Sequence, residues 1–231
     1  FYNTFSKLLN MNIHIENILN DLEKDNCQAY LLTQFTNVEY ISGYRPTSFA
    51  FCIIKENPII YASGMDMELA NHDSSIEVKK YESFEVMIDE LKKEGIRNLA
   101  IEPSLPFSSY AKLKDDFSID SKTYVDKQRM IKTPLEIEKI TKATEIAQKS
   151  FLQLDILNNR GTEKEVAFDL VRFMIENGAF KESFDTIVTS GPASSLPHAI
   201  PQNKKLSQPI LIDWGAIFEG YCSDNTRTIV Y

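Results

Sequence analysis

Apolar residues in the first half of the chain alternate between helical and strand-like spacing. Ile15, Ile18, Leu19 and Leu22 recur at helical spacing, which predicts a helix. Short apolar runs predict strands at 29–33, 49–54, 59–62, 76–81 and 99–101, and a further helix is expected around 86–91. This alternation predicts a mixed α/β domain that ends near residue 125.

Two capping motifs mark helix starts in the second half. Thr133-Pro134-Leu135-Glu136 combines a capping threonine, a proline at the first helical position and a glutamate at the third. Thr162-Glu163-Lys164-Glu165 repeats the threonine and glutamate spacing, and the helix that it opens is expected to end at Gly178. For Glu163 and Glu165 we predict a helix cap and a solvated face rather than metal ligation.

The last segment carries two aspartates, Asp213 and Asp224, in a predicted β-hairpin. Residues 210–212 and 226–231 are apolar or β-branched, and 218–220 is expected to form the turn. With a two-residue loop, facing positions differ by an odd number, so both aspartates fall on one face, directly opposed or one diagonal apart. Their Cβ atoms are then expected about 5 to 8 Å apart. At this separation, one of two buried carboxylates must either take a proton or find a cation. A divalent metal ion can neutralise both carboxylates.

Charge and composition exclude several classes of function. The 231 residues include 25 Lys and Arg against 33 Asp and Glu, and the net charge of −8 argues against nonspecific nucleic-acid binding. Three cysteines without the spacing of a metal site or disulfide framework predict reduced thiols in a reducing compartment. No apolar run approaches the ~20 residues of a membrane span, and no signal peptide is recognisable. We therefore expect a cytoplasmic protein with no nucleic-acid or membrane partner.

Several motifs together resemble one protein family. Asp213-Trp214-Gly215, the segment 220–228 that contains Ser223-Asp224, and Leu196-Pro197-His198-Ala199 resemble the Xaa-Pro peptidases, prolidase and aminopeptidase P, of the pita-bread metallopeptidase superfamily. Residues 37–43, 130–138 and 184–191 resemble further segments of the same family. The resemblance implies an α/β (α+β) fold, with a creatinase-like mixed α/β amino-terminal domain at 12–125. The first half of a pita-bread catalytic domain is expected to follow at 126–231.

The resemblance also implies a metal site and a catalytic histidine. In these enzymes two aspartates, a histidine and two glutamates hold two metal ions, and Asp213 and Asp224 match the aspartates. The donor set favours Mn²⁺ or Co²⁺. His198 matches a loop histidine that contacts the substrate or stabilises developing oxyanion charge. Nothing matches the carboxyl-terminal half that supplies the other ligands, so this chain alone is expected to bind metal weakly and to be inactive.

The implied activity is metal-dependent hydrolysis of the peptide bond that precedes proline, carried out by the full-length protein. The substrate is either an Xaa-Pro dipeptide or a longer peptide amino terminus, and a homodimer is expected. One alternative is a noncatalytic pita-bread module that binds peptides or proteins, and another is creatinase-like amidinohydrolysis without metal. Both alternatives are opposed by the retained Asp213 and Asp224.

Overall fold

The computed structural model describes residues 2–156 and 161–231, which fold as two compact units. The first unit runs to Ile131 and the second begins at Lys132. Helix α6 (Tyr124–Met130) belongs to the first unit because Tyr124 and Val125 are buried in its core. Among the described helices, none has the length and apolar character needed to cross a membrane.

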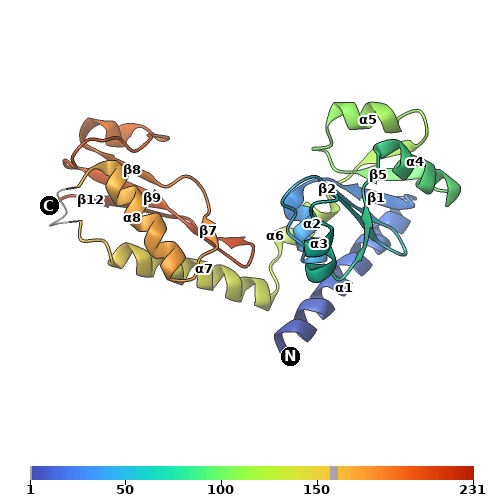
Figure 1. The fold of residues 1–231 in the computed structure, drawn as a ribbon, viewed down its shortest axis with the longest axis horizontal. Helices are drawn as coiled ribbons and strands as arrows, with labels where there is room; N and C mark the ends of the chain where they lie inside the picture. The colour runs from blue at the N-terminus through green and yellow to red at the C-terminus, as the bar shows by residue number, and fades with distance from the viewer. Residues whose placement is uncertain (1, 157–160) are drawn as a thin grey trace. The chain divides into compact units, whose positions relative to one another are not determined.

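A six-stranded mixed sheet forms the centre of the first unit, in the order β4-β3-β2-β1-β5-β6. Its strands are β1 (Ala29–Leu32), β2 (Ala50–Ile54), β3 (Ile59–Ala62), β4 (Glu77–Lys80), β5 (Asn98–Ile101) and β6 (Ser118–Ser121). Strand β2 runs antiparallel to both β1 and β3, whereas β4, β5 and β6 pair in parallel with their neighbours. The predicted mixed α/β architecture is confirmed (Figure 1).

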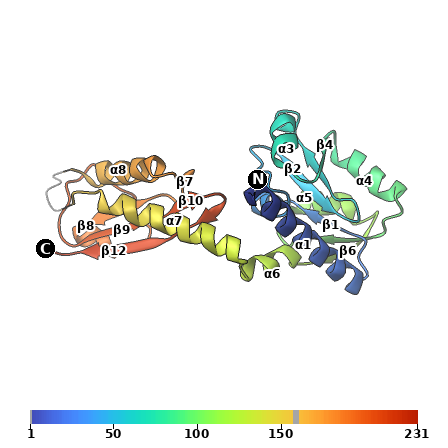
Figure 2. The ribbon, with the colours of Figure 1, turned by 90° about the horizontal axis from the view of Figure 1, so that it is seen from below.

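Helices cover both faces of this sheet. Successive strand residues point to opposite sides, and in β1 the residues on both sides are apolar and buried. Tyr30 and Leu32 of β1 pack with α1 (Tyr2–Lys24), α2 (Phe35–Ser42), α3 (Met67–Asp73) and α6. On the other face, Ala29 and Leu31 pack with α4 (Phe84–Lys93) and α5 (Phe107–Leu113). The unit therefore has three layers, with the sheet in the middle (Figures 1 and 2).

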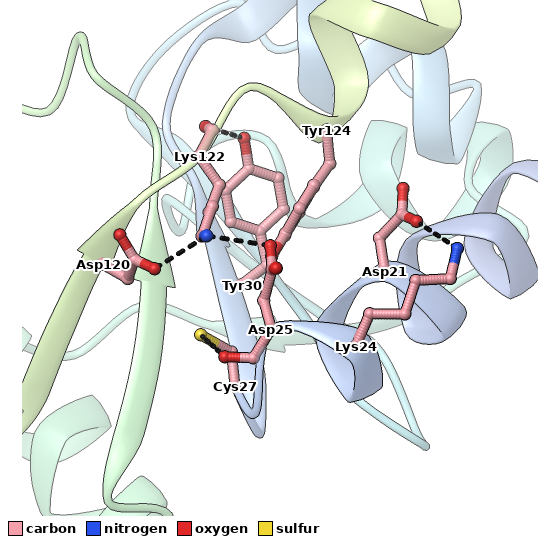
Figure 3. Close-up of polar contacts among 8 residues, drawn as sticks. All are labelled: Asp21, Lys24, Asp25, Cys27, Tyr30, Asp120, Lys122 and Tyr124. Carbon is pink, nitrogen blue, oxygen red and sulfur yellow. Dashed lines mark hydrogen bonds and ion pairs between the residues drawn. The ribbon is translucent and has the colours of Figure 1, made fainter.

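A polar network joins the end of α1 to the segment between β6 and α6 (Figure 3). The Lys122 Nζ atom lies 2.8 Å from Asp25 Oδ2 and 2.7 Å from Asp120 Oδ2. Tyr124 donates its hydroxyl proton to Asp25 at 2.6 Å, and Tyr30 donates to the Lys122 carbonyl at 2.9 Å. The hydrogen bond from Lys122, followed by that from Tyr124, lowers the pKa of Asp25. The network fixes the segment that leads out of the first unit.

In its described residues, the second unit contains two α-helices, a short 3₁₀ helix and two small sheets. Helices α7 (Pro134–Leu152) and α8 (Glu163–Glu176) begin with the predicted capping boxes, both of which are confirmed. One sheet has the order β12-β9-β8 and the other β11-β10-β7. The strands are β7 (Lys181–Glu182), β8 (Ile187–Ser190), β9 (Ile210–Trp214), β10 (Ala216–Phe218), β11 (Tyr221–Cys222) and β12 (Asn225–Ile229). The core lies between the helices and the inner face of β9, where Ile210, Ile212 and Trp214 are buried.

Candidate metal centre

A single pairing register runs through the hairpin that carries the two aspartates. Phe218 faces Tyr221 next to the turn, and Asp213 faces Thr226 further along. The two turn residues, Glu219 and Gly220, have φ values of 45° and 86°. Positive φ at both central positions is the condition for a type I′ turn, whose twist matches that of the flanking strands. The predicted turn is confirmed, and it sets the register for the aspartates.

This register places Asp213 and Asp224 on the same face, one diagonal apart. Asp224 directly precedes β12 and is two residues from Thr226, the cross-strand partner of Asp213. Desolvation is the largest cause that raises the pKa of Asp213, and the neighbouring Asp224 raises it further, whereas the hydrogen bond from Thr226 lowers it. That hydrogen bond runs from Thr226 Oγ1 to Asp213 Oδ1 at 3.0 Å. The prediction of a shared face is confirmed.

The prediction that these carboxylates are buried is wrong. Asp213 is half-buried and Asp224 is exposed. The reason is the alternation of β9: its even-numbered residues, Ile210, Ile212 and Trp214, fill the core, so Asp213 lies on the opposite face.

Gly215 is required where both strands of the hairpin are interrupted. A Cβ atom at this position would lie 1.9 Å from the Ser223 carbonyl oxygen and 2.1 Å from Ser183 Oγ. Ser183 Oγ donates a hydrogen bond to the same Ser223 carbonyl at 2.8 Å. The glycine two residues after Asp213 therefore permits a close approach of the backbone that precedes Asp224.

Helix α7 anchors the residue next to each aspartate. Trp214 Nε1 donates to the Ala147 carbonyl at 2.9 Å, and Ser223 Oγ donates to the Ala143 carbonyl at 3.2 Å. Ala143 and Ala147 lie one helical turn apart on the same side of α7. Figure 2 shows this helix running beside the hairpin strands. Sequence reasoning missed both anchors, although a buried tryptophan N–H requires an acceptor.

His198 lies on an exposed turn in the segment between β8 and β9. The short 3₁₀ helix η1 (Gly191–Ser195), which begins this segment, packs against β8 and β9. Within the described part of the chain, His198 forms no hydrogen bond or ion pair. The structure thus brings Asp213 and Asp224 together and leaves the His198 side chain accessible.

The two glutamates in the first turn of α8 have different surroundings. Glu165 Oε2 accepts a hydrogen bond from the Thr162 amide at 2.7 Å, so its predicted capping role is confirmed. Glu163 is only 2% exposed, and the predicted solvated position is wrong for this residue. Its carboxylate turns inward because Ser190 and Gln202, distant in sequence, donate hydrogen bonds to it.

The pair formed by Asp213 and Asp224 has the chemistry of a divalent-cation site. Carboxylate oxygens are hard ligands. A cation between them would offset the repulsion by Asp224, which adds to desolvation in raising the pKa of Asp213. Over residues 2–156 and 161–231, no group of three or more His, Cys, Asp or Glu side chains could hold a metal ion. The described residues thus fit part of such a site.

Comparisons with known proteins identify the family. Residues 14–131 match the model of the creatinase/prolidase N-terminal domain, and residues 138–231 match that of metallopeptidase family M24. The chain belongs to the creatinase/prolidase family. This membership confirms the resemblance inferred from the motifs and the fold class that the resemblance implied.

Members of the creatinase/prolidase family resemble this chain in both sequence and structure. The Xaa-Pro dipeptidase of Pyrococcus horikoshii is 36% identical over 228 residues, which are 95% of this chain and 64% of that protein. The crystal structure of the prolidase from the same organism has a TM-score of 0.86 at 35% identity and covers 94% of this chain and 64% of its own. The structure of the X-Pro aminopeptidase of Thermotoga maritima has a TM-score of 0.85 at 29% identity and covers 93% of this chain and 64% of its own. The chain spans about 64% of the length of these proteins.

Proposed function

We propose that the full-length protein is a metal-dependent peptidase that cleaves the peptide bond preceding proline. The observation that carries the proposal is the pair of aspartates, Asp213 and Asp224, on one face of the hairpin. Relatives named Xaa-Pro dipeptidase and prolidase support the choice of substrate.

Asp213 and Asp224 are the residues that would hold the metal. Divalent ions at such sites lower the pKa of water and polarise the carbonyl group that is attacked. The surrounding residues keep the carboxylates in place. Thr226 orients Asp213 through its hydroxyl, while the α7 anchors at Trp214 and Ser223 restrain the backbone beside both ligands.

His198 would act on the substrate rather than on the metal. Its exposed imidazole is free to donate a hydrogen bond to the carbonyl oxygen of the bond being cleaved, where negative charge develops in the transition state. The flanking Pro197 and Pro201 restrict the backbone of the loop. An exposed histidine on a restricted loop suits a contact that forms only when substrate is bound.

The finer features of the proposal follow from the family and the donor set. Oxygen-rich ligation favours Mn²⁺ or Co²⁺. Relatives named dipeptidase and aminopeptidase are both structurally similar to the chain, so comparison of a dipeptide with a longer peptide would assign the activity. The proposal also includes a cytoplasmic location and a homodimeric state for the protein.

Two substitutions in the full-length protein test the separate roles of Asp224 and His198. Asp224→Ala is expected to abolish metal retention and activity together, because it removes a ligand. His198→Ala is expected to retain metal and to lower turnover of an Xaa-Pro dipeptide by about 10²-fold or more, the scale for loss of one transition-state donor. Loss of metal in His198→Ala, or wild-type turnover, would show that the role given to this residue is wrong.

A further inference from the structure

Glu163 joins the two limbs of the loop between β8 and β9, that is, the chain before His198 and the chain after it. Ser190, at the end of β8, donates its hydroxyl proton to Glu163 Oε1 at 2.7 Å. Gln202, four positions after His198, donates its amide proton to Glu163 Oε2 at 3.1 Å. Each carboxylate oxygen therefore binds a different limb. The Glu163 side chain is 2% exposed, so water does not compete with these hydrogen bonds.

Backbone hydrogen bonds close the base of the same loop. The Glu163 amide donates to the Lys204 carbonyl at 3.0 Å, and the Gly191 amide donates to the carbonyls of Ser207 and Pro209 at 2.9 Å. Lys204 Nζ donates to the Ser190 carbonyl at 2.9 Å and lies 4.0 Å from Glu163 Oε1. The buried carboxylate therefore has a nearby cation as well as two hydrogen-bond donors, as a buried charge requires.

The element that supplies Glu163 is rigid. Helix α8 packs into the core through Val166, Leu170 and Met174, and its capping box fixes the first turn. Glu163 lies in that turn, so its carboxylate has a fixed position relative to β8. A flexible loop gains a defined course when it is tied to such an element.

We propose that Glu163 is a positioning residue that sets the location of the His198 imidazole. The inference rests on the proposed catalytic role of His198, and it assigns Glu163 no contact with substrate or metal. Without the carboxylate, the Ser190 hydroxyl and the Gln202 amide lose their acceptor. The limb that follows His198 then becomes free to move, and the imidazole no longer stays within reach of the reacting carbonyl.

Glu163→Gln in the full-length protein tests the inference, because the side chain keeps its shape but one oxygen becomes a donor. Misplacement by about 1 Å can cost ~10²-fold in rate, so we expect kcat for an Xaa-Pro dipeptide to fall by about 10-fold or more. KM is expected to stay near wild type, because the lost interaction acts in the transition state. Metal content is expected to stay the same, because Glu163 is assigned no contact with the metal. Amide hydrogen exchange is expected to accelerate over residues 196–206 and to remain unchanged over 210–229.

Glu165→Gln is the matched control, since it lies on the same helical turn and glutamine also completes a capping box. It is expected to leave both kcat and hydrogen exchange of the loop unchanged. Ser190→Ala is a milder variant that removes only the bond to the first limb, and it should lower kcat in the same direction if Glu163→Gln does not fold.

Two results would overturn the inference, and a third would remove its catalytic part. Wild-type kcat with unchanged exchange in Glu163→Gln would show that the carboxylate does not position the loop. Loss of metal in that variant would assign Glu163 to the metal site instead. If His198→Ala keeps wild-type turnover, the proposed role of His198 is wrong and the catalytic part of the inference falls with it. The exchange data alone then decide whether Glu163 holds the loop.

Discussion

Gly215→Ala is expected to destabilise the second unit strongly. The added Cβ would lie 1.9 Å from the Ser223 carbonyl oxygen, 2.1 Å from Ser183 Oγ and 2.8 Å from the Ser223 carbonyl carbon. Two of these three atoms belong to the backbone and cannot rotate away. Overpacking typically costs about 1–3 kcal/mol and occasionally more, so we expect a loss of about 3 kcal/mol or more in the free energy of unfolding.

Trp214 provides the assay for this loss. It is the only tryptophan of the chain, it is 1% exposed, and it stacks on Phe151 with ring centroids 4.6 Å apart. Its fluorescence therefore reports unfolding of the second unit separately from the first. Urea denaturation followed by this signal gives the change in midpoint and, with the slope, the change in free energy.

A matched glycine separates steric overlap from backbone strain. Gly178 has φ 104°, and apart from its neighbours in the chain a Cβ there would meet no atom within 4 Å. Gly178→Ala therefore introduces conformational strain alone, worth roughly 1–2 kcal/mol. Gly215→Ala is expected to be clearly the more destabilising of the two. If it unfolds at the same urea concentration as wild type or as Gly178→Ala, the close approach to Ser223 is not a constraint and the account of the Asp-x-Gly segment fails.

Three further predictions concern individual side chains. Ser223→Ala is expected to lower the free energy of unfolding, followed by Trp214 fluorescence, by about 1–3 kcal/mol, because the buried Ala216 amide loses its acceptor. The control Ser195→Ala, at an exposed site, should change this free energy by less than about 0.5 kcal/mol. Burial raises the pKa of Asp66, but several hydrogen bonds lower it more, so its folded pKa lies below its ordinary value and its ionised form stabilises the fold. This contribution is present above the unfolded pKa of about 3.9 and is lost as the pH falls through the folded pKa, so the thermal midpoints of wild type and Asp66→Asn, followed by circular dichroism, should converge at low pH. Calorimetric titration of the 231-residue chain with Mn²⁺ should give weak binding that Asp213→Asn removes, whereas tight binding by the variant would exclude this aspartate as a ligand.

Local sequence patterns predicted the features that depend on few residues. Both capping boxes involve partners only three positions apart, Thr133 with Glu136 and Thr162 with Glu165. The hairpin turn and the shared face of its two aspartates likewise follow from spacing alone. Strands β1, β2 and β3 were predicted because their apolar runs are continuous, as expected for strands that are buried on both faces.

Features that depend on distant partners could not be predicted in this way. Strand β6 was missed because Ile119 is its one apolar residue, whereas the other edge strand, β4, contains Val78 and is flanked by Ile76 and Tyr81. The inward course of Glu163 depends on Ser190 and Gln202, which lie 27 and 39 positions away. Ser183 and Ser223 leave no room for a side chain at Gly215, and spacing along the sequence does not reveal this close approach.

Hydrolysis by the full-length protein after removal and return of metal decides whether the protein is a metal-dependent peptidase that selects proline. The measurement compares an Xaa-Pro dipeptide with the matched Xaa-Ala dipeptide, first after chelation and then after addition of Mn²⁺. We expect no turnover without metal, restored turnover of the Xaa-Pro dipeptide with Mn²⁺, and much slower turnover of Xaa-Ala. Metal-independent hydrolysis, or equal rates on the two dipeptides, would contradict it.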